Sequence, residues 1–509
     1  MTLAKPLSIA TAKTLAVDRR EPAHIRGPTT PASRTGLSPI CEFLPSESLP
    51  FVVALASPLV RHTFEGTLTA DDSKRYLNNA FEVPHGVERL ELKLEFAPLR
   101  VSGIGNMLTL SVYDPAGSRG AGHRGGAEHR VFITRYSATP GYVPGPLSAG
   151  LWLIEIDTHL IMPGPPCDYQ LEVAAYGGSG NEAPSWPPTH PGIRLRRGPG
   201  WYRGDLHRHS DHSDGHWTVD DLVAWARANR LDFVTLTDHN TISGLARMDD
   251  LTADDLLTIG GSEMTTYWGH ALALGVHRWV DWRVQPGKRS MRDIASEVTE
   301  SGGVFVIAHP KSPGDPDCTG CDWRYADMMP GNARVVEVWN GSWTGDSNNE
   351  RAVALWYSWL EQGLRIVASA GSDAHEATPP NVRLGYNVVY ANELTEREIL
   401  EAIATGHSYL SSGPRLELTA EMPNGLLAMS GDLLPREATK LRLRWQLANG
   451  DARLRLVVDG RFVEEQTAGS SGEWMLDVGR WSARSCLVEL RTRSDELAAM
   501  TNPIFWDAS

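Results

Sequence analysis

The feature that most constrains the fold is an alternation of strand-like and helix-like segments between residues 201 and 414. Buried strands are predicted at DFVTLTDH, GGVFVIAHP, ARVVEVWN and LRIVASAGSDAH, because short apolar runs there are bounded by turn residues. Helix patterns separate these runs and begin or end at capping residues: Thr218, Ser290, Gly363, Thr395 and Gly406. The alternation favours an α/β fold with a mostly parallel sheet, open or closed into a barrel.

Segments of a different kind flank this region. Between residues 45 and 178, runs such as NMLTLSVYDPAG and GLWLIEIDTHLIM alternate apolar and polar residues, which is typical of an N-terminal β-sandwich or jelly roll. Residues 179–200, dense in Gly and Pro, are predicted to be a linker, and residues 415–509 a small C-terminal β domain. Residues 1–44 are predicted to be a flexible tail, with an export signal as the alternative interpretation.

The composition excludes several classes of protein. The 509 residues include 48 Lys and Arg against 62 Asp and Glu, and this net charge of −14 argues against a nucleic-acid partner. No apolar run approaches the roughly 20 residues that span a bilayer, so no membrane partner is expected. We expect a cytoplasmic protein that acts on a small molecule, and a homodimer is left open.

Five cysteines are too few and too scattered for a disulfide scaffold. Cys318 and Cys321 form a C-x-x-C pair without a second pair nearby. We interpret this pair as unbonded, with metal binding or a disulfide as the alternatives.

Residues with metal-ligating side chains follow the predicted strands. His207 and His209 form an H-x-H pair, and in an extended segment both imidazoles point the same way. The other candidates occur in TDHNT, GSEMTTYWGHALALG, VIAHP, AGSDAH and a Ser-Asp-Gly turn: Asp214, His239, Glu263, His270, His309, Asp373 and His375. A single histidine of this kind is more often structural, but strand ends of α/β folds converge on one mouth. So many N and O ligands exceed the four of one zinc ion, so more than one metal ion is expected.

The motifs DLHRHSDHSDG, TDHNT, GSE, IAHP and GSDAH, in this order, resemble those of the polymerase-and-histidinol-phosphatase (PHP) family. The segments GSEMTTYWGHALALG, VEVWNG and TNPIFW are similar to its carbaryl-hydrolase-like branch. The resemblance implies a distorted (β/α)7 barrel with two or three divalent ions (Zn, Mn or Fe) held by the nine residues above, although the position of the His270 motif varies in the family. Asp205 and Asp238 lie next to ligands and are expected to orient imidazoles, with proton acceptance by Asp238 as an alternative.

Together these features predict a metal-dependent hydrolase. Two cations that share a water lower its pKa from about 15.7 towards about 7, so that hydroxide can attack a carbonyl carbon or a phosphorus. Trp268 and Trp339 lie near ligand motifs and predict an aryl-accepting pocket, which favours carboxyl esters or carbamates, including aryl N-methylcarbamates; the alternative is that these rings pack against helices.

Two other functions stay open. Lys311 is a candidate catalytic cation, and with Arg383 it keeps hydrolysis of a small phosphomonoester or phosphodiester as the second prediction. The third is a non-catalytic binding protein whose β domains do the work.

Overall fold

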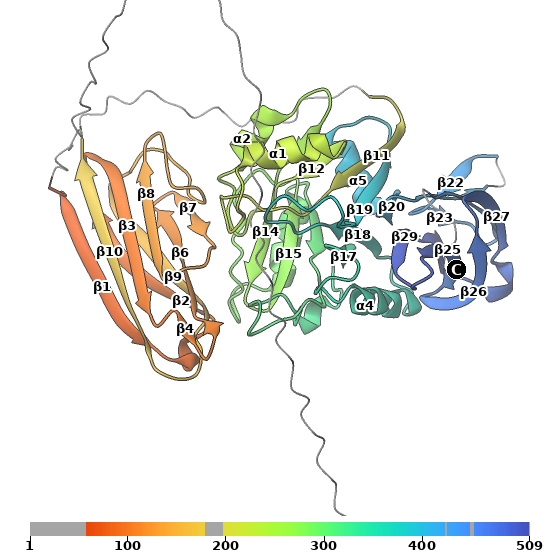
Figure 1. The fold of residues 1–509 in the computed structure, drawn as a ribbon. Helices are drawn as coiled ribbons and strands as arrows, with labels where there is room; N and C mark the ends of the chain where they lie inside the picture. The colour runs from red at the N-terminus through yellow and green to blue at the C-terminus, as the bar shows by residue number, and fades with distance from the viewer. Residues whose placement is uncertain (1–56, 179–196, 423–424, 448–451, 508–509) are drawn as a thin grey trace, which may run out of the picture. The chain divides into compact units, whose positions relative to one another are not determined.

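A computed structural model describes residues 57–178, 197–422, 425–447 and 452–507 (Figure 1). All elements named below belong to one compact unit, Ala56–Ser509. The predicted tail and most of the predicted linker lie outside the described residues. None of the described helices is long and apolar enough to cross a membrane.

The N-terminal part of the described chain is an antiparallel β structure with one buried core. Its main strands are β1 (Val60–Leu68), β2 (Arg75–Val83), β3 (Val87–Ala97), β6 (Met107–Asp114), β7 (Gly117–Gly122), β8 (Glu128–Thr134), β9 (Gly150–Leu160) and β10 (Cys167–Gly177). They form two four-stranded sheets, ordered β1-β10-β3-β8 and β2-β9-β6-β7. In β3 the side chains of Leu90, Leu92, Leu94 and Phe96 are buried and alternate with more exposed ones, so one face of the sheet packs into the core that both sheets share.

The central region contains two sheets. In the first, β11 (Gly200–Asp205), β12 (Phe233–Thr235) and β13 (Leu257–Ile259) are parallel, and β19 (Tyr386–Ala391) and β20 (Ser408–Ser411) continue it antiparallel. The second sheet has the order β14 (Gly261–Thr266), β15 (Gly269–Leu274), β16 (Val304–Ile307), β17 (Val335–Asn340) and β18 (Val367–Gly371). Its last three strands are parallel, whereas β14 and β15 form an antiparallel hairpin.

The predicted (β/α)7 barrel is not found as a closed sheet within the described residues. Isolated bridges join segments of the two central sheets: Arg208 with Ala374 and His239 with Glu263 in parallel, and Ser342 with Leu384 antiparallel. The hairpin is one reason, because GSEMTTYWGHALALG folds into two antiparallel strands rather than into a strand followed by a helix. The result is a mixed α/β region whose strand ends still face one another.

Five α-helices occur in the described central region: α1 (Val219–Ala228), α2 (Leu245–Leu251), α3 (Met291–Glu300), α4 (Asn349–Glu361) and α5 (Glu396–Thr405). Figure 1 shows α1 beside α2 and α4 near β17. The predicted N-caps Thr218 and Ser290 accept hydrogen bonds from the third residue of their helices. Thr395 does the same, but the carboxylate of Glu398 contacts Arg397 and Asn392 and does not complete the predicted capping box.

Some of the C-terminal strands extend the first central sheet, and the others form a sheet of their own. The C-terminal strands are β21 (Arg415–Glu421), β22 (Leu427–Met429), β23 (Leu433–Leu434), β24 (Lys440–Gln446), β25 (Ala452–Val458), β26 (Arg461–Ala468), β27 (Ser471–Asp477), β28 (Ser485–Arg491), β29 (Leu497–Thr501) and β30 (Ile504–Trp506). Strand β29 pairs with β20, so hydrogen bonding runs from the central region into these strands. The sheet β22-β21-β24-β27 packs with them around a separate core.

Candidate metal centre

Nine side chains meet where the central strands end, and we call them the ligand cluster. They are His207, His209, Asp214, His239, Glu263, His270, His309, Asp373 and His375. Most follow the end of a strand directly, whereas Glu263 and His270 lie within the β14–β15 hairpin. The structure brings all nine predicted ligands together, and their role as ligands stays a prediction.

Glu263 lies at the centre of the cluster and is fully buried. Its Oε2 is 3.2 Å from His207 Nε2 and 3.0 Å from His239 Nδ1. Its Oε1 is 3.1 Å from both His270 Nδ1 and His309 Nε2. One carboxylate therefore contacts imidazoles from four segments of the chain.

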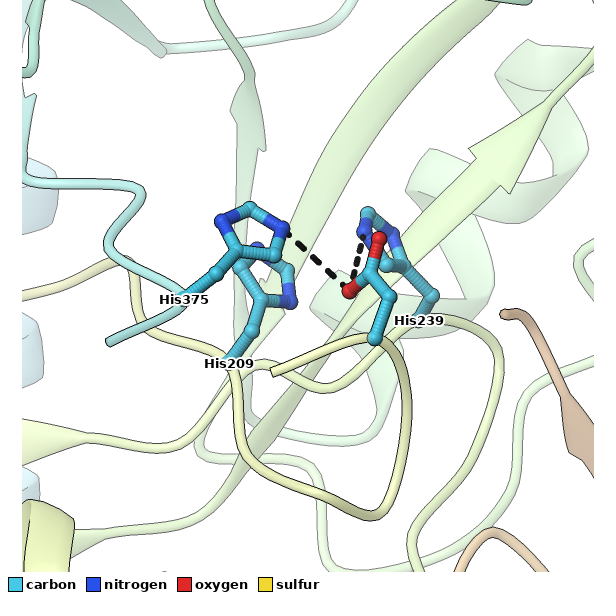
Figure 2. Close-up of side chains that lie close together, drawn as sticks. His209, His239 and His375 are labelled. Carbon is cyan, nitrogen blue, oxygen red and sulfur yellow. Dashed lines mark ion pairs between the residues drawn. The ribbon is translucent and has the colours of Figure 1, made fainter. Parts of the chain in front are cut away.

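Two aspartates hold the outer part of the cluster. Asp373 Oδ1 is 2.9 Å from His209 Nε2. Asp214 Oδ1 is 3.4 Å from His239 Nε2 and 3.2 Å from His375 Nε2, and Figure 2 shows His209, His239 and His375 grouped in this way. His209, Asp214, His239 and His375 form one of several groups of N and O atoms that lie close enough together to hold a cation, and Asp373 belongs to another.

A glycine permits this close approach at the end of β18. A Cβ at Gly371 would lie 2.3 Å from Glu337 Oε1 and 2.3 Å from His207 Cβ, closer than atoms can pack. Only glycine leaves room there for the His207 side chain and the Glu337 carboxylate.

Hydrogen bonds on the far side of the imidazoles direct their lone pairs inward. His207 Nδ1 donates to Glu337 Oε1 at 3.1 Å, and His375 Nδ1 donates to the Asp373 carbonyl oxygen at 2.9 Å. In the neutral form these rings carry no proton on Nε2, and each Nε2 then faces carboxylate oxygens that also cannot donate. A cation between the Nε2 atoms and the carboxylate oxygens would provide a partner for both kinds of atom.

Buried atoms without a hydrogen-bond partner mark the same place. Within the described residues these atoms include His207 Nε2, His209 Nε2, Asp214 Oδ1 and Glu263 Oε2. The ion pairs of Asp214, Glu263 and Asp373 within the same residues are with histidines alone. Buried carboxylates need positive charge near them, so the donor set fits divalent ions that prefer imidazole and carboxylate ligands, such as Zn, Mn or Fe.

The pKa shifts follow from the mixture of burial and opposite charge. Burial raises the pKa of Glu263, but the His207 and His239 imidazoles outweigh it and hold this pKa well below its usual range. Burial lowers the pKa of His239, but Asp214 and Glu263 outweigh it and raise this pKa well above its usual range. Burial also lowers the pKa of His375, yet hydrogen bonding to Asp214 raises it to about 9. Protons therefore compete for the cluster, and binding of a cation releases them.

Strand β17 carries Glu337, a residue of the site that the sequence analysis missed. Its carboxylate is 1% exposed, and a charged residue inside the apolar run VVEVW was the available signal. The pairing of β17 with β18 shifts between Glu337 and Trp339, and this β-bulge changes which later side chains face the site. Asn340 therefore shares the face of Glu337, since its Nδ2 donates to Glu337 Oε2 at 3.1 Å and to Asp373 Oδ2 at 3.2 Å.

The two aspartates next to the ligands bind donors of the neighbouring turn. Asp238 Oδ1 accepts hydrogen bonds from Ser210 N and Ser213 Oγ, both at 2.7 Å, and its Oδ2 accepts one from Ser210 Oγ at 2.7 Å. Asp205 Oδ2 accepts one from Arg208 Nε at 2.8 Å. Within the described residues, neither carboxylate has a hydrogen bond to an imidazole nitrogen of the cluster, so the expected orientation of imidazoles is not found. Both carboxylates bind backbone and side-chain donors of the segments that carry the ligands, and proton acceptance by Asp238 stays a prediction.

A cavity of about 410 Å³ opens onto the ligand cluster. Its walls include seven of the nine cluster residues, all but His207 and His209. The other walls come from residues 99–107, 123–126 and 160 of the N-terminal part and from residues 316–321. Lys311, Trp268 and Trp339 do not line it. Trp268 is 41% exposed beneath Lys74, and Trp339 is fully buried with its Nε1 bonded to a backbone carbonyl, so their positions do not support the predicted aryl pocket.

The prediction that Cys318 and Cys321 are unbonded is wrong. They form a disulfide in the cavity wall, where the sequence analysis favoured an unbonded pair. Cys321 Sγ lies 3.9 Å from His270 Nδ1. The C-x-x-C spacing permits this bond, and the sequence analysis kept it as an alternative, but spacing alone does not decide whether the bond forms.

Comparisons with known proteins give weak similarities. No family model and no curated protein matches the chain. A two-domain Bacteroides vulgatus protein, described as containing a predicted PHP-like metal-dependent phosphoesterase, is 17% identical, with a TM-score of 0.36 over 62% of this chain and 99% of its own. A metal-dependent phosphoesterase from Bifidobacterium adolescentis is 18% identical, with a TM-score of 0.26 over 35% of this chain and 89% of its own. An amidohydrolase from Chromobacterium violaceum is 20% identical, with a TM-score of 0.26 over 35% of this chain and 92% of its own. These scores are too low to support an assignment.

Proposed function

We propose that this protein is a metal-dependent hydrolase of the PHP type with a binuclear or trinuclear centre in the ligand cluster. The observation that carries the proposal is the group of buried imidazole and carboxylate atoms that face one another without hydrogen-bond partners. Such atoms are costly to bury unless a cation binds them. Their position at one wall of a cavity gives a small molecule access to them.

The chain's own residues would hold and orient this centre. Glu263 contacts the largest number of imidazoles and is the candidate bridging ligand, while Glu337 keeps the His207 proton on Nδ1. When bound, divalent ions would supply an activated water and neutralise negative charge that develops on the substrate. The surrounding hydrogen bonds of Asn340 and Asp238 would fix the carboxylate and turn geometry before the substrate binds.

The substrate we favour is a carboxyl ester or a carbamate. Leu99, Met107 and Leu160 supply apolar wall to the cavity, and its volume suits a small aryl or alkyl ester. Arg100 is the only arginine or lysine among the described lining residues, and its Nη1 already donates to the Gly103 carbonyl oxygen at 2.8 Å. Apart from the metal ions, a phosphoester would find this arginine alone as a cationic partner among the described lining residues.

The test is a parallel assay of the metal-loaded full chain against aryl acetates, aryl N-methylcarbamates and aryl phosphates. We expect turnover of an acetate or carbamate, with loss of metal content and of activity in His209→Ala and Asp373→Ala. His216→Ala is the matched control, because this histidine lies in the same loop with a side chain that is 76% exposed.

If the chain turns over the aryl phosphate fastest, phosphoester hydrolysis replaces ester or carbamate hydrolysis as the proposed function. Bound metal with no turnover of any of the three would favour a binding protein. Full activity of His209→Ala would contradict the proposed site itself.

A further inference from the structure

The N-terminal sheets contribute a histidine to the cavity. His123 directly follows β7, and its side chain is 8% exposed and lines the cavity. Its ring centroid lies 4.5 Å from that of His239 in the ligand cluster. A residue far away in the sequence thus reaches the edge of the candidate metal centre.

The fold leaves a polar atom of this ring unused. His123 Nδ1 is buried and has no hydrogen-bond partner among the described residues. The neighbouring His159 packs edge-on against it at 4.8 Å and uses its own Nε2 to contact Thr109 Oγ1 at 2.9 Å. A buried imidazole without a partner lowers stability, so its position beside the cavity is explained if a ligand completes its hydrogen bonding.

The backbone around His123 contacts residues 211–212, which lie between the cluster residues His209 and Asp214. Arg124 Nη2 donates to the Pro140 carbonyl oxygen at 2.7 Å and to that of Asp211 at 3.4 Å. Gly141 N donates to Ser243 Oγ at 3.0 Å. Gly141 has a φ of +97°, and a Cβ there would lie 2.9 Å from the carbonyl oxygen of His212. The position of His123 is therefore set by several contacts.

The same N-terminal sheets supply the apolar side of the cavity. Leu99, Met107 and Leu160 line it together with His123 and with the acids and imidazoles of the ligand cluster. A ligand in the cavity can therefore meet the candidate metal-binding groups, the imidazole of His123 beside them and these three apolar side chains.

We propose that His123 is a substrate-binding residue that forms a hydrogen bond to the ester or carbamate group while Leu99, Met107 and Leu160 hold its apolar substituent. This inference rests on the proposed function, because the substrate class is taken from it. The N-terminal strands then determine specificity, and the metal-binding side chains alone do not form the complete substrate site.

The test measures binding rather than turnover. The probe is N-methyl-2-phenylacetamide, in which a CH2 replaces the ester oxygen of phenyl N-methylcarbamate, so the bond that the enzyme would cleave is missing. Its dissociation constant is measured by calorimetry on the metal-loaded full chain and on His123→Phe, with metal content determined for each. Loss of one hydrogen bond predicts binding about three- to tenfold weaker at unchanged metal content, and His123→Gln should recover part of it.

His129→Phe is the matched control. His129 is a 6% exposed histidine of the same sheets, it also has a nitrogen without a partner, and it lies outside the cavity lining. The proposal is overturned if His123→Phe binds within twofold of wild type, if it loses metal, or if His129→Phe weakens binding equally. Absence of probe binding to wild type also overturns it. Failure of the proposed function gives a different result: the probe binds to wild type, but no ester or carbamate is turned over.

Discussion

Replacing Glu337 by glutamine tests whether the cluster depends on the orientation of His207. The Glu337 carboxylate accepts three hydrogen bonds, from His207 Nδ1 at 3.1 Å, His309 N at 3.0 Å and Asn340 Nδ2 at 3.1 Å. Glutamine has the same shape but offers only one accepting oxygen. Because the two donors at Oε2 cannot be reversed, its NH2 group must take the place of Oε1 and face His207.

This reversed hydrogen bond sets the expected size of the loss in metal affinity. His207 must then accept at Nδ1 and move its proton to Nε2, the atom that faces Glu263 and Asp373. Loss of a hydrogen bond to a charged group costs about 1.5–3 kcal/mol, which corresponds to roughly 10- to 100-fold in metal affinity. Changes of residues that orient metal ligands typically cost about the same.

The assay is a competitive titration of metal affinity against a chelator, with wild type and Glu337→Gln side by side. Glu489→Gln is the matched control, since Glu489 is a similarly buried carboxylate whose partners are Tyr357 and Arg491. We expect the affinity to fall at least tenfold in the first variant and to stay unchanged in the second. A folded Glu337→Gln protein with wild-type affinity would refute the reasoning.

Three further outcomes follow from other contacts. His277 Nε2 lies 2.8 Å from Glu396 Oε1, and this hydrogen bond raises the pKa of His277. The hydrogen bond therefore stabilises the folded chain fully below pH 6, and this stabilisation is lost as the pH rises through the raised pKa. His277→Gln should lower the melting temperature more at pH 5.5 than at pH 9. Gly141→Ala should destabilise the chain by about 1–3 kcal/mol in denaturant titrations, because of its positive φ and close carbonyl contacts, and unchanged stability would contradict the observed turn. Asp238→Asn should lower metal affinity as well as kcat if this residue orients the 210–213 turn, whereas a fall in kcat alone would favour proton acceptance.

Much of the secondary structure could be predicted because its signals are local. Helix α1 begins after Thr218 as predicted, and α4 and α5 end next to Gly363 and Gly406, which have φ of +81° and +86°. The H-x-H pair and the strand-end motifs also identified the side chains that the structure brings together. Most of these motifs follow short apolar strands, and a sequence displays such strands and the polar residues after them directly.

The remaining features depend on contacts between distant segments. The β-bulge in β17 places Asn340, rather than Trp339, on the site face, and no residue type announces such a shift. The position of Trp268 depends on a distant segment, because Lys74 lies over its ring. His123 belongs to another sheet, so its place beside His239 could not be read from spacing.

The central claim is that the ligand cluster binds metal ions. The direct measurement is the metal content of the full chain, purified without chelators and analysed by inductively coupled plasma mass spectrometry beside Asp373→Ala. The account predicts about two or three equivalents of Zn, Mn or Fe per wild-type chain and a clear loss in the variant. A wild-type chain without stoichiometric metal, even after incubation with these ions, would contradict it.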